Sequence, residues 1–268
     1  MNLGVIDSKE ELRQVVNLAS KFLVCGTIRG DLPDQKVYEV REKNRRLGLG
    51  LMGLHEWLLK RGEKYEVTPE LHQWLRIYKD ESERAANEHC DRFFLNRPVA
   101  YRAIAPTGSI GTMASTTTGI EPLFAVAFKR RYITGGSHWH YEYVVDVTAD
   151  RIIKETGCDP EKIETANTLA EEPWRRLHFQ AEVQNYVDMA ISSTINLPHP
   201  EEQSFTTEEF AEILSSYAPF IRGFTCFPNG SRGGQPLVEV PYREAVNNLG
   251  MIFEEHQEEQ CKSGVCGV

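Results

Sequence analysis

The chain has 268 residues, of which 41% are hydrophobic and 26% are charged, and its formal net charge is −9. This composition supplies apolar material for one large domain or two small ones. The acidic balance argues against direct DNA binding, although it leaves room for a local site that holds one small phosphate. No apolar run approaches the roughly 20 residues that a membrane helix needs, and the N-terminal residues lack signal-peptide features. We therefore expect a cytoplasmic protein without membrane contact.

The first part of the chain predicts three helices. Residues 7–25 begin with a capping signal and place apolar residues at helical spacing. Residues 41–62 predict a second helix whose first half is rich in glycine. Each mid-helix glycine costs up to about 1 kcal/mol relative to alanine, so this run indicates the close approach of another backbone. A third helix begins at Pro69, with Thr68 as its N-cap, and runs to about Cys90.

The rest of the chain predicts strands in alternation with helices. The predicted strands are 101–106, 124–133, 193–198 and 222–232, and the predicted helices are 140–157, 173–192 and 206–220. This alternation favours an α/β architecture with parallel strands. From residue 257 onward the sequence is polar, so we expect one domain over residues 1–256 and a flexible arm over residues 257–268.

The stretch AIAPTGSIGTMASTTTGIEP, residues 103–122, places small hydroxyl and glycine residues directly after a predicted strand. Thr107 and Ser109 supply hydroxyl groups, Gly108 allows backbone to approach a ligand, and a following helix would offer free N–H groups to an anion. These features suit a phosphate cradle and a simple capped turn about equally well. Glu121, at the end of the stretch, is interpreted as a structural carboxylate that caps a helix or belongs to a buried pair.

The cysteines fall into two groups. Cys261 and Cys266 bracket Lys-Ser-Gly-Val, a loop that could bring two sulfur atoms to the distance of a disulfide, and Lys262 would favour the thiolate. A redox pair on a mobile arm is favoured over an incidental pair, and zinc would need more ligands than His256 nearby provides. The other four are interpreted as reduced thiols, namely Cys25, Cys90, Cys158 and Cys226.

Two further motifs remain open to a functional or a structural interpretation. The run HWHYEY, residues 138–143, invites a metal site, but no cluster of Cys, Asp or Glu accompanies it, so a polar rim is favoured and no metal is expected. The basic run at residues 129–131 could help to bind an anion or could lie at a solvated strand end.

Five blocks of the sequence resemble, in the same order, the C-terminal half of the catalytic chain of ribonucleotide reductase. The blocks are RRLGLGLMGLHEWLLKRG (45–62), APTGSIGTMASTTTGIEPLFAVAF (105–128), SSTINLP (192–198), GFTCFPNGSRGGQPL (223–237) and CKSGVC (261–266). The resemblance covers nearly the whole chain. It implies the C-terminal portion of a ten-stranded α/β barrel, with a mobile cysteine tail.

The resemblance also implies roles for particular residues. Thr107, Gly108, Ser109 and Ile110 match the family segment that holds a phosphate of the ribonucleotide substrate. Cys261 and Cys266 match the C-terminal dithiol that re-reduces an active-site disulfide and is itself reduced by a protein of the thioredoxin or glutaredoxin type.

One part of the family pattern has no counterpart here. The Asn-x-Cys-x-Glu strand, which carries the thiyl radical cysteine, is missing, so the resemblance implies a fragment or one subunit of a split enzyme. Such a chain would be inactive without an N-terminal partner chain that supplies the radical cysteine. A non-catalytic module that binds nucleotide phosphate is the alternative.

The block around residue 226 bears on the class of reductase. The tyrosyl-radical class has two adjacent tyrosines in the matching strand, whereas Cys226 and Phe227 stand here. In this respect, and in the sequence of the SSTINLP block, the chain resembles the class that depends on adenosylcobalamin. A large-subunit fragment of the tyrosyl-radical class is the second alternative.

Overall fold

The structure is a computed structural model that describes residues 1–134, 138–199, 201–202, 204–229 and 237–254. Contacts along the backbone divide it into two compact units. Unit 1 comprises residues 1–121, 174–194 and 207–225, and unit 2 comprises the described parts of residues 122–173, 195–206 and 226–268. The arm predicted over residues 257–268 lies outside the described residues.

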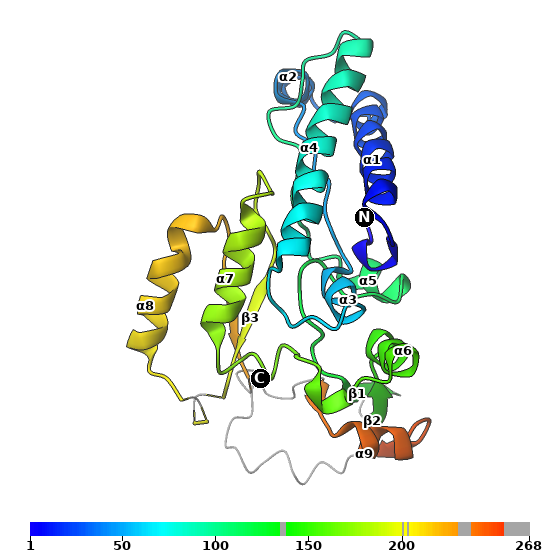
Figure 1. The fold of residues 1–268 in the computed structure, drawn as a ribbon, viewed down its shortest axis with the longest axis vertical. Coiled ribbons are helices and arrows are strands. Elements are labelled where there is room, and N and C mark those ends of the chain that lie inside the picture. Colours follow the sequence, from blue (N-terminus) through cyan, green and yellow to red (C-terminus); the bar gives the residue numbers. More distant parts are fainter. Residues whose placement is uncertain (135–137, 200, 203, 230–236, 255–268) are drawn as a thin grey trace. The chain divides into compact units, whose positions relative to one another are not determined.

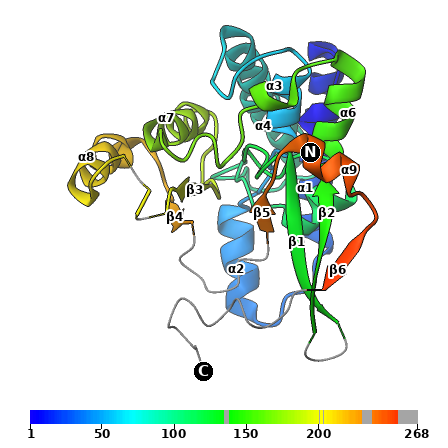
Figure 2. The ribbon, with the colours of Figure 1, turned by 90° about the horizontal axis from the view of Figure 1, so that it is seen from below.

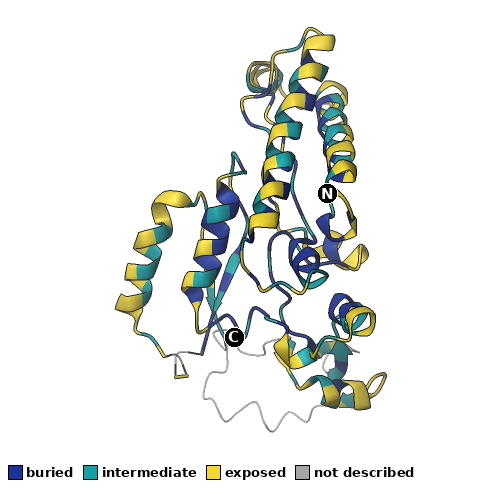
Figure 3. Cartoon of the chain, in the orientation of Figure 1, coloured by how far each residue is buried: buried dark blue, intermediate teal, exposed yellow. Residues whose placement is uncertain are grey.

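Two long helices pack side by side in unit 1, as Figure 1 shows: α1 (Lys9–Arg29) and α4 (Pro69–Arg92). Both begin where the sequence predicts. The Ser8 side chain accepts a hydrogen bond from the Glu11 N–H, and Thr68 does the same for the Leu71 N–H, which satisfies N–H groups at each helix start. The buried side chains follow one side of each helix, while the opposite side is exposed (Figure 3).

The prediction of one helix over residues 41–62 is wrong. The chain instead forms α2 (Gln35–Asn44), an extended segment, and the short helix α3 (Leu54–Leu59). The close approach inferred from the glycines is nevertheless found, because a Cβ atom at Gly50 would lie 2.7 Å from the Ala103 carbonyl oxygen. The glycines therefore serve an extended segment that lies against a neighbouring backbone.

Extended segments of unit 1 pair in parallel through isolated bridges. The paired residues are Asn2 with Met52, Leu49 with Arg102, and Ile104 with Ile191. The predicted strand at 101–106 thus has a parallel neighbour on each side, which agrees with the parallel strands expected for an α/β fold. Extended backbone around Ile191 also corrects the helix predicted over 173–192, since α7 (Pro173–Gln184) ends earlier.

Unit 2 contains an antiparallel sheet that the alternation of helices and strands did not predict. Its strand order is β5 (Leu237–Glu239), β1 (Ala127–Thr134), β2 (His138–Val145) and β6 (Ile252–Glu254), and Figure 2 shows the two long central strands between their short neighbours. The helix predicted over 140–157 is therefore wrong in its first half. Only the second half forms a helix, α6 (Val147–Thr156), which begins after Asp146 caps it.

The remaining elements are short or lie near the predicted positions. A two-stranded sheet joins β3 (Thr194–Leu197) and β4 (Thr225–Pro228). The other helices are η1 (Leu3–Val5), α5 (Gly108–Met113), η2 (Pro160–Lys162), α8 (Thr207–Tyr217), η3 (Ala218–Phe220) and α9 (Tyr242–Asn247). Within the described ranges, no helix combines the length and the apolar character that crossing a lipid bilayer requires.

Candidate functional site

The loop over residues 103–121 leaves the paired strand segment at Ile104 and turns at Thr107. Thr107 adopts the left-handed backbone conformation, with φ of 52°, and serves as the N-cap of α5. Its carbonyl oxygen accepts a hydrogen bond from the Gly111 N–H at 2.7 Å, and its hydroxyl oxygen accepts one from the Gly119 N–H at 2.8 Å. Thr107 therefore joins the outgoing and returning arms of the loop.

The first residues of α5 offer their backbone to solvent. Gly108, Ser109 and Ile110 are exposed, and among the described residues their main-chain N–H groups have no hydrogen-bond partner. A Cβ atom built on Gly108 meets nothing within 4 Å, so there is open space beside this residue. Three free donors at the start of a helical turn can bind an anion. The structure thus brings together the four residues predicted to hold a phosphate, with Thr107 as the turn and the next three as donors.

Thr116 and Thr117, in the second half of the loop, are held by hydrogen bonds to α3 and its N-cap. The Thr116 hydroxyl donates to Glu56 Oε2 at 2.6 Å, and the Glu56 N–H donates to the Thr117 hydroxyl oxygen at 3.3 Å. The Gly53 N–H donates to the Thr117 carbonyl oxygen at 2.7 Å. Glu56 is fully buried, so the loop rests on a polar group inside the core of unit 1.

Glu121, at the end of the loop, forms an ion pair, which is one of the two structural roles that the sequence left open. Its carboxylate forms an ion pair with Arg176 and accepts a hydrogen bond from the Thr194 N–H at 2.6 Å. Arg176 is buried, donates to the Thr194 carbonyl oxygen at 2.9 Å and lies over the ring of Tyr65. Burial raises the pKa of the Tyr65 hydroxyl, which keeps this group neutral. The interpretation of Glu121 as structural is confirmed.

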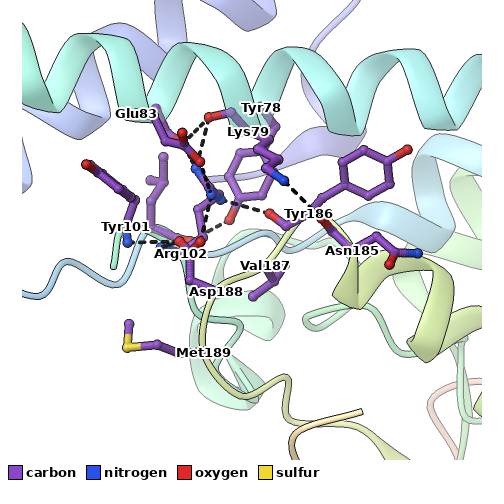
Figure 4. Close-up of polar contacts among 12 residues, drawn as sticks. Tyr78, Lys79, Glu83, Tyr101, Arg102, Asn185, Tyr186, Val187, Asp188 and Met189 are labelled. Atoms are coloured by element: carbon purple, nitrogen blue, oxygen red, sulfur yellow. Dashed lines mark hydrogen bonds and ion pairs between the residues drawn. The ribbon is translucent and has the colours of Figure 1, made fainter. Parts of the chain in front are cut away.

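Arg102 precedes the loop and forms a polar centre that the sequence analysis missed (Figure 4). It is fully buried, and its guanidinium donates to Asp188 at 2.9 Å and to Glu83 at 2.6 Å. The remaining partners are the carbonyl oxygens of Tyr186 and Lys79 and the hydroxyl of Ser82. Asp188 also accepts hydrogen bonds from the N–H groups of Tyr101 and Arg102.

This cluster uses every donor of the guanidinium, and it fixes the strand from which the loop starts. An arginine inside the apolar run YRAIAP was the available signal, because a charge in such a position must be paired.

Among the described residues, the four cysteines outside the C-terminal pair are free thiols, as predicted. Burial raises the pKa of the Cys90 thiol. Cys25 Sγ lies 3.3 Å from Nε2 of His89, whose pKa is lowered by burial and by the charges of Lys21 and Arg92. The predicted redox pair, Cys261 and Cys266, lies outside the described residues.

The basic run on β1 is engaged by side chains of the neighbouring strand. Arg130 forms an ion pair with Glu142, and Arg131 lies over the Trp139 ring with its Cζ atom 4.6 Å from the centroid. Lys129 lies 5.2 Å from the centroid of the Tyr141 ring. Over the described ranges of the chain, no group of three or more His, Cys, Asp or Glu residues is arranged to hold a metal ion.

Comparison with known proteins shows which family this part of the chain resembles. Residues 97–218 match the family described as "Ribonucleotide reductase, barrel domain". This range contains the whole loop, α7, and Arg102 with its partners Tyr186 and Asp188, whereas the partners Lys79, Ser82 and Glu83 precede it. This part of the chain is therefore similar to the ribonucleotide reductase barrel domain.

The proteins of similar sequence point to one class of reductase. A protein of Mycobacterium phage D29 whose name contains the words "adenosylcobalamin-dependent ribonucleoside-triphosphate reductase" is 27% identical, over 96% of this chain and 41% of its own length. The "Vitamin B12-dependent ribonucleoside-diphosphate reductase" of Mycobacterium tuberculosis (strain CDC 1551 / Oshkosh) is 28% identical, over 85% of this chain and 37% of its own. The chain thus resembles the catalytic chain of the adenosylcobalamin-dependent reductases and spans about two fifths of its length.

Solved structures support the fold. A crystal structure of a B12-dependent (class II) ribonucleotide reductase matches with a TM-score of 0.72 at 16% identity, over 88% of this chain and 37% of that one. The alpha subunit of a class Id ribonucleotide reductase from Actinobacillus ureae matches with a TM-score of 0.59 at 15% identity, over 86% of this chain and 49% of that one. Since both classes share the fold, the fold alone does not select the class.

Proposed function

We propose that this chain is the C-terminal component of an adenosylcobalamin-dependent ribonucleotide reductase and that it holds the substrate by a phosphate. The observation that carries the proposal is the exposed turn of Gly108, Ser109 and Ile110, with free N–H groups and open space above Gly108. These donors match a phosphate, which is rich in acceptor oxygens and negatively charged. The sequence resemblance of the same residues to the family's phosphate segment supports the assignment.

The chain's own chemical contribution is to orient the nucleotide and to return electrons. The rigid loop would fix the ribose relative to the reacting groups, which lowers the entropic cost of reaching the transition state. Cys261 and Cys266 would reduce a disulfide by thiol exchange. Their two thiols lose two electrons and two protons to form a disulfide, while the oxidised pair becomes two thiols. A thioredoxin or glutaredoxin type protein then reduces the new disulfide.

The radical chemistry belongs to a partner chain in this proposal. That chain carries the radical cysteine that this sequence lacks, and bound adenosylcobalamin supplies the radical. No contact to the cofactor is assigned to residues of this chain, and no step is derived through it. The names of the sequence relatives support the cobalamin class, as does the presence of Cys226 and Phe227 in place of adjacent tyrosines.

Reconstitution tests the proposal. The chain is mixed with the N-terminal part of a homologous reductase, adenosylcobalamin, a ribonucleotide and a reductant, and the deoxyribonucleotide product is measured. We expect product only when both chains are present. Absence of product under conditions in which the two chains bind each other would contradict the proposal.

A non-catalytic module that binds nucleotide phosphate is the alternative function. Replacing Cys261 and Cys266 together by serine separates the two functions. Turnover that depends on a thioredoxin type reductant should collapse, whereas nucleotide binding by a module should not change. Activity that requires a metal-containing small subunit in place of cobalamin would instead indicate the tyrosyl-radical class.

A further inference from the structure

Glu56 is a buried carboxylate directly beneath the loop. Its side chain is fully buried, and its Oε1 atom lies 3.1 Å from Nζ of Lys60, one helical turn further along the chain. Lys60 also donates to the Gly4 carbonyl oxygen at 2.7 Å, and a Cβ atom at Gly4 would lie 2.6 Å from Cδ of Glu56. The carboxylate is thus paired, closely packed and unable to move far.

A continuous series of hydrogen bonds joins this carboxylate to the exposed donors. Glu56 Oε2 accepts from the Thr116 hydroxyl at 2.6 Å, and the Thr116 N–H donates to the Gly111 carbonyl oxygen at 3.0 Å. The Gly111 N–H in turn donates to the Thr107 carbonyl oxygen at 2.7 Å, which closes the turn that presents Gly108. Releasing Thr116 would therefore loosen the backbone that aims the donors.

The ion pair with Lys60 explains how the Glu56 carboxylate can lie close to a site that binds an anion. A buried ion pair adds little net stability compared with apolar side chains, but it imposes a defined geometry on the groups that it bonds. An unpaired negative charge below an anion site would also repel the anion. Lys60 neutralises that charge while leaving Glu56 Oε2 to accept from Thr116.

We propose that Glu56, held by Lys60, is a positioning residue that fixes the phosphate-binding turn through Thr116. The inference rests on the proposed function. Because Glu56 is fully buried, we expect it to act on phosphate affinity only through the order of the loop.

Two measurements on the full chain test this inference. Pyrophosphate affinity is measured by calorimetry, and hydrogen exchange is measured by mass spectrometry for peptides that cover residues 103–119. The variants are Glu56→Ala, Glu56→Gln and Thr116→Val. Glu88→Gln is the matched control, because it changes the same chemical group in an exposed ion pair with Arg84.

Both Glu56→Ala and Thr116→Val remove the bond between Thr116 and Glu56, so pyrophosphate should bind about tenfold more weakly. Thr116→Val also removes the contact of its hydroxyl with Asn2 Oδ1 at 3.2 Å, and Glu56→Ala also removes the ion pair with Lys60. The loop amides should exchange faster in both variants. Glu56→Gln keeps an acceptor for Thr116 and should retain affinity within about threefold, as should the control. Thr116→Val leaves α3 intact, so the test survives if Glu56→Ala fails to fold.

Unchanged affinity and unchanged loop exchange in Thr116→Val would overturn the inference. Failure of the proposed function gives a different result, because the parent chain itself would then not bind pyrophosphate. In that case the exchange rates alone decide whether Glu56 orders the loop.

Discussion

The sequence offered two places where an anion could bind: residues 107–110 of the loop and the basic residues of the β1–β2 hairpin. The two regions differ in which of their groups are free to bind an anion. In the loop, backbone N–H groups are free and the side chains that hold them are buried. In the hairpin, the cationic side chains at residues 129–131 are exposed or half-buried, and each contacts a carboxylate or an aromatic ring. A run of basic residues is thus a weaker sign of an anion site than a turn whose backbone is fixed from beneath.

The largest expected effect is the loss of stability when a buried arginine near the loop is replaced, compared with an exposed arginine in the hairpin. Arg102→Met leaves Asp188 without its buried partner, and breaking such a pair costs about 3–5 kcal/mol of stability. Arg130→Gln removes a hairpin pair whose arginine side chain is 57% exposed, and this should cost no more than about 1 kcal/mol. Urea unfolding of the two variants measures both effects. Equal losses of stability in the two variants would show that burial of the arginine does not determine its contribution.

The next largest expected effect is a loss of stability where the backbone at Gly50 lies against the backbone at Ala103. Gly50→Ala would place a Cβ atom 2.7 Å from the Ala103 carbonyl oxygen, and such overpacking costs about 1–3 kcal/mol. Gly26→Ala is the control, because nothing lies within 4 Å of its Cβ position in α1. That change should stabilise the helix by up to about 1 kcal/mol. Thermal unfolding should therefore shift in opposite directions for the two variants.

A change at Gly108 should affect binding and leave stability nearly unchanged. Gly108→Val adds a side chain into open space, so the fold should tolerate it, but the branched side chain would cover the N–H donors. We expect pyrophosphate affinity to fall about tenfold, which corresponds to about 1.4 kcal/mol. Calorimetry gives the affinity and circular dichroism the stability. Normal binding by this variant would place the anion elsewhere.

His89 is half-buried and should give the smallest effect. Its pKa is lowered by burial and by Lys21 and Arg92, so the folded chain binds a proton less readily than the unfolded chain. As pH falls below the ordinary histidine value of about 6.5, stability should therefore decline through the lowered pKa. His89→Gln should show a smaller decline between about pH 7.5 and about pH 5.5 in urea unfolding. An identical decline in both proteins would contradict the assignment.

Much of the fold and the loop could be predicted from the sequence because the signals were local. The N-caps at Ser8 and Thr68 set the helix starts, and the order of small residues at 107–110 indicated a turn. The contacts of Glu56 and Arg102 join residues that are far apart in the chain, so no local pattern reveals their partners. The hairpin did have a local signal, because Gly135 and Gly136 stand between two runs rich in aromatic and β-branched residues, but the helix predicted over residues 140–157 cut across the second run.

The central claim is that the N–H groups at the start of α5 bind a phosphate. The most direct test is an NMR titration of the ¹⁵N-labelled chain with inorganic pyrophosphate, followed at each amide. The account predicts saturable shifts at Gly108, Ser109 and Ile110, with little change at residues 129–131. Shifts confined to residues 129–131, or no saturable shift in the loop, would contradict it.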